Sequence, residues 1–173
     1  KWRTRCDACP QLRRDPYEFV KTTFEAKIAA YARGNLVIAS PSRWLAQTAS
    51  ESALLRGRPI ECIPYGVDLD TFHPSRREAG RARLGVREDE AVILFSADTA
   101  AERRKGFTEL RAALEMARAA LDASKISAAV RLAVLGHADP ATLPEGAVAT
   151  GHLSSRTALA EVVAASDLYV LPS

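Results

Sequence analysis

Apolar and polar positions alternate along the chain with two periods, and each period predicts one kind of element. Apolar residues recur at three- and four-residue steps within residues 17–33 and 105–121, which predicts two amphipathic helices. Further helices are expected over residues 43–54 and 155–165, and in a short Arg- and Ala-rich stretch that ends at Gly85. Short apolar runs predict strands at residues 36–39, 60–64, 92–95, 130–135, 147–149 and 168–171.

The order of these elements predicts two domains. A strand, a helix and a strand joined by tight turns between residues 36 and 64 form a parallel crossover unit. Residues 65–74 are rich in turn formers, and a second series of strands and helices begins after Gly85. We therefore expect an α/β protein with doubly wound parallel sheets, divided into residues 1–74 and residues 75–173.

Composition is that of an ordinary soluble globular protein, with 47% apolar and 26% charged residues among 173. The formal net charge is only +3, so we expect no nucleic-acid partner. Lys and Arg outnumber Asp and Glu within residues 1–33. This basic stretch is either a solvated surface or a face toward a phosphorylated acceptor or an anionic membrane, which would make the association with the membrane peripheral.

The sequence predicts neither a membrane-spanning segment nor a signal peptide. No run approaches the roughly 18 apolar residues of a transmembrane helix, and no apolar stretch of a signal peptide follows the basic start. The chain lacks an initiator Met and stops directly after an apolar strand, so we expect a piece of a longer protein. Three cysteines, an odd number, make no disulfide framework, which favours a cytoplasmic location.

The segment Arg103-Arg104-Lys105-Gly106 is the strongest candidate for a binding site. It lies between a predicted buried strand and the next helix, at the edge where open α/β sheets bind ligands. Three cations at a helix N-terminus oppose the helix macrodipole, and a bound phosphate offsets that cost. Gly106 lets a ligand approach the backbone without a Cβ in the way. The alternative interpretation is an exposed basic loop whose charges point into water.

A second strand-to-helix turn, Gly151-His152-Leu153, is expected at the same edge of the sheet. Its exposed backbone could bind a flat nucleobase through main-chain hydrogen bonds. The alternative is a routine turn in which Ser154 or Ser155 caps the following helix. GxSxG, Walker A and GxGxxG motifs are absent, which disfavours hydrolases, P-loop NTPases and dinucleotide enzymes.

Cys6 and Cys9 have the spacing of a metal-binding pair. They supply two of the four ligands of structural zinc, so the pair is either half of a zinc site or an ordinary turn. Cys62 is expected within a strand as a small core residue. His73 and His137 have no nucleophile or carboxylate at motif spacing, and we interpret both as structural.

Several of these segments together resemble the GT-B glycosyltransferases of family 4, retaining enzymes that use nucleotide-sugar donors. The resemblance runs from about residue 36 to the end of the chain, and no single motif carries it. The matching segments are residues 39–42, 63–74, 104–107, 134–136, 151–153 and 165–173. The resemblance implies parts of two Rossmann-like doubly wound parallel-sheet domains that face each other across a cleft.

In such an enzyme, residues 1–74 would be the C-terminal part of the acceptor-side domain, and residues 75–173 most of the donor-binding domain. The implied donor is a UDP- or GDP-sugar, and the implied acceptor is a glycan or a lipid-linked molecule. No metal cofactor is implied for catalysis, because cations of the protein hold the diphosphate and stabilise the charge that develops on it. The implied donor residues are Arg103, Arg104, Lys105 and Gly106 for the diphosphate, and Gly151, His152 and Leu153 for the nucleobase.

The chain also departs from the family pattern. Ser96-Ala97-Asp98 stands where many members have a Gly-Arg pair, so Arg103 would replace that arginine. Tyr65 stands where Asn is usual. The family's two-glutamate motif would follow residue 173, so the catalytic residues are expected outside this chain, and we expect no turnover by the chain alone.

Two other functions remain open from the sequence. A sugar-nucleotide epimerase has a similar two-domain shape but uses no sugar acceptor. A zinc-ribbon module that binds nucleic acid would explain the basic end with Cys6 and Cys9, but it accounts for nothing after residue 36.

Overall fold

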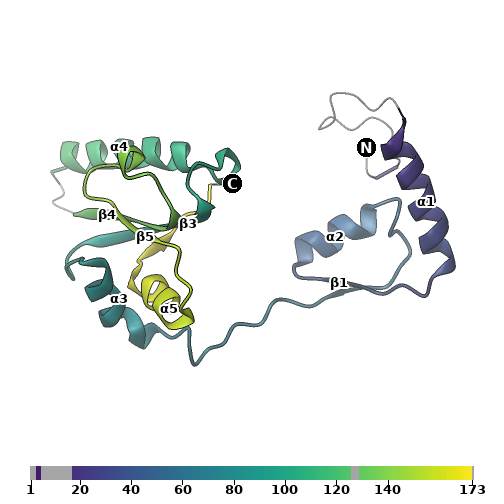
Figure 1. The fold of residues 1–173 in the computed structure, drawn as a ribbon, viewed down its shortest axis with the longest axis horizontal. Helices are drawn as coiled ribbons and strands as arrows, with labels where there is room; N and C mark the ends of the chain where they lie inside the picture. Colours follow the sequence, from purple (N-terminus) through teal and green to yellow (C-terminus); the bar gives the residue numbers. More distant parts are fainter. Residues whose placement is uncertain (1–2, 5–16, 126–128, 173) are drawn as a thin grey trace. The chain divides into compact units, whose positions relative to one another are not determined.

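The computed structural model describes residues 3–4, 17–125 and 129–172, and the chain divides into two compact units (Figure 1). The first unit is Lys1–Gly66 and the second unit is Val67–Ser173. Each contains a parallel sheet with helices packed on it, which confirms the predicted α/β fold class with Rossmann-like parallel sheets. Residues 67–74, grouped with the first domain by the sequence pattern, cluster with the second unit.

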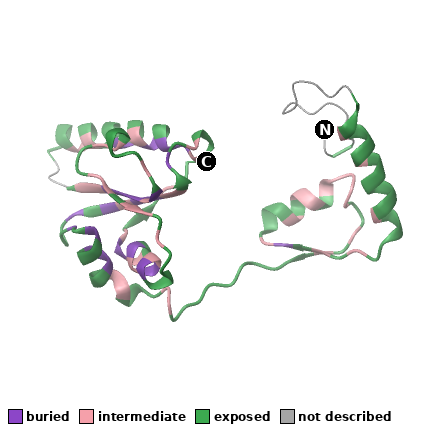
Figure 2. Cartoon of the chain, viewed as in Figure 1, coloured by how far each residue is buried: buried purple, intermediate pink, exposed green. Residues whose placement is uncertain are grey.

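The first unit contains helix α1 (Phe19–Arg33), strand β1 (Ile38–Ser40), helix α2 (Arg43–Glu51) and strand β2 (Ile60–Cys62). The two strands pair in parallel, as expected for a strand–helix–strand crossover. Ser42 caps α2, because its hydroxyl accepts a hydrogen bond from the Leu45 backbone N–H at 3.1 Å. Among the residues described in this unit, only Ser40 is buried (Figure 2). The described residues of the first unit therefore form little apolar core.

The second unit is built on a four-stranded parallel sheet in the order β5-β4-β3-β6. Its strands are β3 (Ala91–Thr99), β4 (Val130–His137), β5 (Val148–Gly151) and β6 (Leu168–Tyr169). Its helices are η1 (Pro74–Arg76), α3 (Arg77–Leu84), η2 (Arg103–Lys105), α4 (Phe107–Ala123), η3 (Pro140–Thr142) and α5 (Arg156–Ala165), where η marks a short 3-10 helix. Helix α4 covers one face of the sheet, and α3 and α5 cover the other (Figure 1). This is a doubly wound arrangement.

Alternate residues of the central strands face opposite helical layers. Val92 and Leu94 of β3 pack in one cluster with buried residues of α3 and α5. Phe95 packs in the other cluster against Phe107 of α4, with the ring centroids 5.1 Å apart. Buried residues therefore concentrate on this sheet and the helices beside it (Figure 2). Coverage of both faces explains why residues 92–95 are continuously apolar.

Helix α4 is amphipathic, with Phe107, Leu110 and Leu114 buried on one side. Met116 on the other side is 74% exposed. The amphipathic helix predicted over residues 105–121 is thus confirmed in its first turns, whereas Ala117, further along the helix, is exposed. In the parts of the chain that the structure covers, no helix combines the length and the apolar character that crossing a membrane requires.

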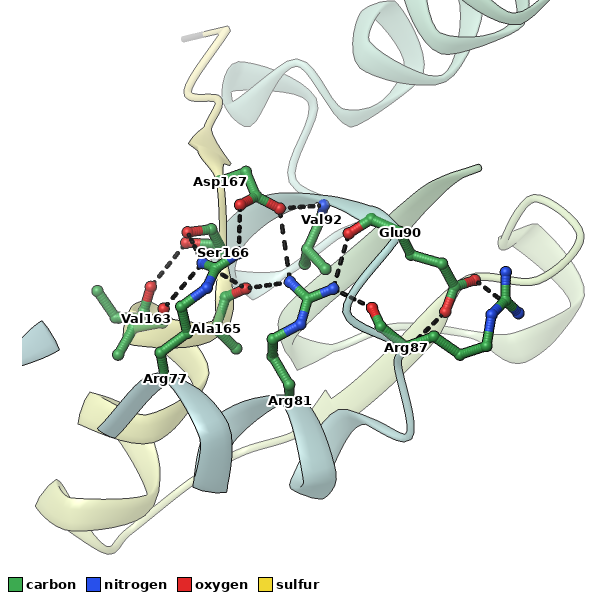
Figure 3. Close-up of polar contacts among 10 residues, drawn as sticks. Arg77, Arg81, Arg87, Glu90, Val92, Val163, Ala165, Ser166 and Asp167 are labelled. Carbon is green, nitrogen blue, oxygen red and sulfur yellow. Dashed lines mark hydrogen bonds and ion pairs between the residues drawn. The ribbon is translucent and has the colours of Figure 1, made fainter. Parts of the chain in front are cut away.

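A network of charged groups joins α3, the end of α5 and the start of β3 (Figure 3). Asp167 accepts hydrogen bonds from the Val92 backbone N–H at 2.8 Å and from Arg77 Nη2 at 2.5 Å. Arg81 is 5% exposed, lies 3.6 Å from the same carboxylate, and donates to the Glu90 carbonyl oxygen at 2.7 Å. Hydrogen bonds and ion pairs thus connect residues far apart in the sequence on the face of the sheet that α3 and α5 cover.

The pKa of Asp167 lies below its ordinary value. Burial by itself raises the pKa of this carboxyl group, but the hydrogen bonds from the Val92 N–H and from Arg77, together with the positive charges of Arg77 and Arg81, lower it by more. Asp167 is therefore ionised at neutral pH, and its negative charge is part of the fold.

Candidate functional site

A cavity of about 610 Å³ lies at the carboxyl ends of β3, β4 and β5 in the second unit. Its walls are the loop after β3, the first turns of α4, the loop after β4 that contains η3, and the end of β5. A cavity of this volume is large enough for a nucleotide. Its position at the carboxyl edge of a parallel sheet is where α/β folds bind ligands.

The cation segment forms the 3-10 helix η2 rather than the first turn of α4. Gly106 follows it in the left-handed conformation, with φ 70°, and is the N-cap residue of α4. The three cations therefore precede the helix, so the helix macrodipole acts on them less than their position in the sequence suggests. Because Gly106 has no side chain to cap α4, the first backbone N–H groups of the helix have no side-chain acceptor there.

The three cations of η2 differ in their surroundings. Arg103 lines the cavity. The Arg104 side chain is 83% exposed and donates from Nε to Glu102 Oε1 at 3.1 Å, a hydrogen bond that lowers the pKa of Glu102. Lys105 is half-buried. Within the described residues, neither the Arg103 nor the Lys105 side chain has a hydrogen-bond or ion-pair partner, so both are free to meet a ligand.

Gly106 is required by the fold itself. A Cβ added there would lie 2.7 Å from Pro172 Cβ and 3.0 Å from the Pro172 carbonyl oxygen, on a backbone at φ 70° that disfavours side chains. The turn that carries the cations is thus packed against the segment after β6. This packing is a reason for glycine at position 106 that does not depend on a ligand.

Of the second predicted turn, Gly151-His152-Leu153, only the first residue lines the cavity. Gly151 lines the cavity, whereas Leu153 packs against the core cluster beneath α5 and His152 is exposed. Ser155 caps α5, since its hydroxyl accepts from the Ala158 backbone N–H at 3.3 Å. The capping interpretation is therefore confirmed for Ser155, and it does not conflict with a ligand beside Gly151.

His137 belongs to the wall of the cavity, although its sequence context gave no reason to select it. Its ring stacks on that of His152, with centroids 6.2 Å apart and an interplanar angle of 17°. The Nδ1 atom lies 3.2 Å from the Asp98 carbonyl oxygen. Its place directly after a strand, at the carboxyl edge of the sheet, is the signal that could have found it.

Close packing of backbone fixes the position of His137. A Cβ at Gly136 would lie 1.7 Å from the Ala97 carbonyl oxygen, so only glycine lets β4 come this close to the irregular end of β3. Beyond the irregularity, the Ala100 backbone N–H donates to the His137 carbonyl oxygen at 2.8 Å. Main-chain contacts therefore hold this part of the cavity rim.

Arg111 is a further cation of the cavity that the sequence pattern did not reveal. It lies on α4 one turn after Phe107, and its Nε is buried without a hydrogen-bond partner in the described part of the chain. A basic residue between the buried positions Leu110 and Leu114 is an interruption of an apolar stripe. That interruption is the sequence signal that points to Arg111.

The cysteine predictions have different outcomes. Cys6 and Cys9 lie outside the described residues, so the proposed zinc half-site stays a prediction. Cys62 is exposed, and its interpretation as a core residue is wrong. The reason is that β2 belongs to a sheet of two strands, and the described part of the first unit covers little of it. The same part of the chain contains no group of three or more His, Cys, Asp or Glu side chains that could hold a metal ion.

Sequence comparison relates the chain to one class of enzymes, although no protein-family model matches it. The curated proteins similar to it are glycosyltransferases. A D-inositol 3-phosphate glycosyltransferase of Segniliparus rotundus is 32% identical over 156 residues, which are 79% of this chain and 33% of that protein.

Two further relatives match shorter parts. D-inositol 3-phosphate glycosyltransferase 1 of Catenulispora acidiphila is 39% identical over 101 residues, 54% of this chain and 24% of that protein. The D-inositol 3-phosphate glycosyltransferase of Geodermatophilus obscurus is 45% identical over 65 residues, 34% of this chain and 14% of that protein. The chain therefore spans a third or less of the length of these relatives.

Proposed function

We propose that the chain is part of a retaining, nucleotide-sugar-dependent glycosyltransferase of family 4 with the GT-B architecture. The observation that carries the proposal is a nucleotide-sized cavity at the carboxyl edge of the second unit, bordered by Arg103 and Gly151, in a chain similar to glycosyltransferases. In this proposal residues 1–74 belong to the acceptor-side domain and residues 75–173 to the donor-binding domain. The enzyme works in the cytoplasm.

The donor is a UDP- or GDP-sugar whose diphosphate is bound by the segment Arg103-Arg104-Lys105-Gly106. These cations stabilise the negative charge that develops on the diphosphate as the sugar leaves, so no metal ion is needed. Support comes from the side chains of Arg103 and Lys105, which have no hydrogen-bond or ion-pair partner among the described residues. Gly151, His152 and Leu153 border the nucleobase, and the exposed imidazole of His152 offers a flat surface for stacking.

The acceptor is a hydroxyl-bearing molecule. The names of the relatives favour D-inositol 3-phosphate, and the family resemblance of the sequence favours a glycan or a lipid-linked acceptor. A radiolabelled nucleotide sugar offered with each acceptor separates these choices. The product also distinguishes a transferase from an epimerase, because an epimerase needs no acceptor.

Calorimetric titration of UDP and GDP into the chain tests the donor site. We expect binding of at least one of them, and a loss of about 10-fold or more in affinity on Lys105→Ala or Arg103→Ala, the effect of one charge-assisted hydrogen bond. Arg83→Ala is the matched control, because Arg83 lies on α3 and is paired with Glu161 at 2.7 Å. Unchanged affinity in both the Lys105 and Arg103 variants would remove the diphosphate assignment.

A further inference from the structure

Arg111 has a buried hydrogen-bond donor that no acceptor of the described chain satisfies. It lies in the second turn of α4 and lines the cavity, as do Arg103 and Thr108. Its Nε is buried, and in the described chain no oxygen accepts a hydrogen bond from it. An arginine stays ionised at every physiological pH, so this buried donor carries part of a full positive charge.

The acidic groups of the cavity do not neutralise it. Glu102 accepts a hydrogen bond from Arg104 Nε at 3.1 Å. Asp139 accepts one from the Ala141 backbone N–H at 2.9 Å and caps η3. Neither carboxylate is within ion-pair distance of Arg111 in the described structure. Both Arg103 and Arg111 line the cavity, and among the described residues neither has an ion-pair partner. In the sequence, Arg103 precedes the start of α4 and Arg111 follows it.

The N-terminus of α4 adds a partial positive charge to those of the two guanidinium groups. Gly106 provides no side-chain cap, so the first backbone N–H groups of a 17-residue helix are available next to the cavity. Two guanidinium groups and a helix N-terminus around one cavity favour an anion with several acceptor oxygens. Phosphate is such an anion, and guanidinium binds it with two parallel hydrogen bonds.

We propose that Arg111 binds a phosphate group in this cavity, together with Arg103, and that it is a phosphate-binding residue in addition to those of the segment Arg103–Gly106. The inference rests on the proposed function, because the phosphate is that of the bound nucleotide. The buried and unpaired Nε is stabilised when a phosphate oxygen accepts its hydrogen bond. Arg111 thus lowers the free energy of unfolding of the ligand-free chain and raises its affinity for a phosphorylated ligand.

The experiment compares UDP, uridine and inorganic phosphate on Arg111→Gln, measured by calorimetry. We expect the affinity for UDP to fall about 10-fold or more, while the affinity for uridine changes less than about 2-fold. Binding of inorganic phosphate at similar affinity to UDP, lost in the same variant, would assign the site to free phosphate and overturn the nucleotide as its source. An equal loss for uridine and UDP would overturn the phosphate contact.

Arg118→Gln is the matched control. Arg118 lies seven residues later on the same helix, and its Nη2 already donates to the Val130 carbonyl oxygen at 3.0 Å. Its replacement should leave UDP affinity unchanged. Arg111→Lys, which keeps the charge but not the planar fork, should retain part of the affinity and serves if Arg111→Gln does not fold.

Two outcomes separate this inference from the proposed function. If the wild-type chain binds neither UDP nor GDP, the proposed function fails. If it binds and Arg111→Gln binds equally well, only the role of Arg111 fails. A nucleotide-free measurement adds an independent readout: Arg111→Met should leave the Tm unchanged or raise it, and a clear fall in Tm would contradict an unsatisfied Nε.

Discussion

At Asp167, one carboxylate links three segments through the Val92 N–H, Arg77 and Arg81. Replacing it with Asn keeps the shape and removes the charge, leaving the buried Arg81 guanidinium without its counter-ion. We expect the free energy of unfolding near pH 7 to fall by about 1–2 kcal/mol, a modest value because the side chain is 38% exposed to solvent screening. Urea titration of both proteins measures the difference.

The same residue makes the stability pH-dependent. The pKa of Asp167 is lowered in the folded state, so its contribution is complete above the ordinary Asp pKa of about 4 and is lost as the pH falls through the lower folded value. The difference between wild type and Asp167→Asn should therefore close at acid pH. Asp89→Asn, which breaks an exposed pair with Arg87, is the control and should show little effect at any pH.

Residue identity alone could indicate which segment binds an anion, but not which side chains in it are free. Arg103, Arg104 and Lys105 are equivalent by charge, and their difference arises because Glu102 pairs with Arg104. Arg111 escaped prediction because the cavity that it lines forms only when α4 and the loop after β4 come together in the fold. The nearest signal in the sequence was one basic residue within an apolar stripe.

Among the elements, the contact between α3 and α5 gives the sharpest test of packing. Gly80 lies inside α3, where helix propensity alone favours alanine by about 1 kcal/mol. A Cβ at Gly80, however, would lie 1.8 Å from the Glu161 carbonyl oxygen of α5. We expect Gly80→Ala to destabilise the chain by about 1–3 kcal/mol or more, because the two helices must move apart.

The matched variant is Ala82→Gly in the same helix, at an exposed position. It should also destabilise, by about 0.5–1 kcal/mol, as propensity predicts. Alanine is thus preferred over glycine at position 82 and glycine over alanine at position 80. Thermal unfolding of both variants measures this reversal, and a stabilising Gly80→Ala would show that α3 and α5 are less closely packed than described.

Elements were the part of the fold that the sequence predicted best, because apolar periodicity is a local property. Each predicted helix and strand has a counterpart in the structure, with ends that shift by a few residues. β3 extends to Thr99, four residues past its apolar run, because it continues to pair with β4 through an irregularity. Such extensions depend on a partner strand and have no signature in the strand's own residues.

For the whole molecule, the two units differ in how many of their described residues are buried. The second unit contains two apolar clusters around its sheet, whereas the described residues of the first unit bury only Ser40. Residues 61–70, which include the boundary between Gly66 and Val67, are all exposed, and Tyr65 is 85% exposed. Protease sensitivity should follow this difference.

Limited digestion with chymotrypsin followed by mass spectrometry makes that prediction concrete. We expect early cleavage after Tyr65, rapid loss of the first unit, and persistence of a fragment that begins at Gly66. A protease specific for arginine provides the control, because arginines occur in both units and only those of the second should be protected. Equal survival of the two units would contradict the difference in burial between their described residues.

The order of elements in the sequence predicts two domains, but it gives no sign of the charge network or of the cavity. Arg77 and Asp167 are 90 residues apart in the sequence, and the cavity gathers residues from β3, α4, β4 and β5. Long-range pairings of polar side chains have no periodicity, so they become visible only when the packing of the sheet is known.

The contact between Gly106 and Pro172 has a consequence for communication within the protein. The turn that carries the cations cannot shift toward the segment after β6 without displacing Pro172, and the converse also holds. An anion that repositions the turn therefore changes the conformational energy of that segment. By thermodynamic linkage, whatever repositions that segment changes the affinity for the anion by the same factor. These two motifs, separate in the sequence, are therefore expected to respond together to a bound anion.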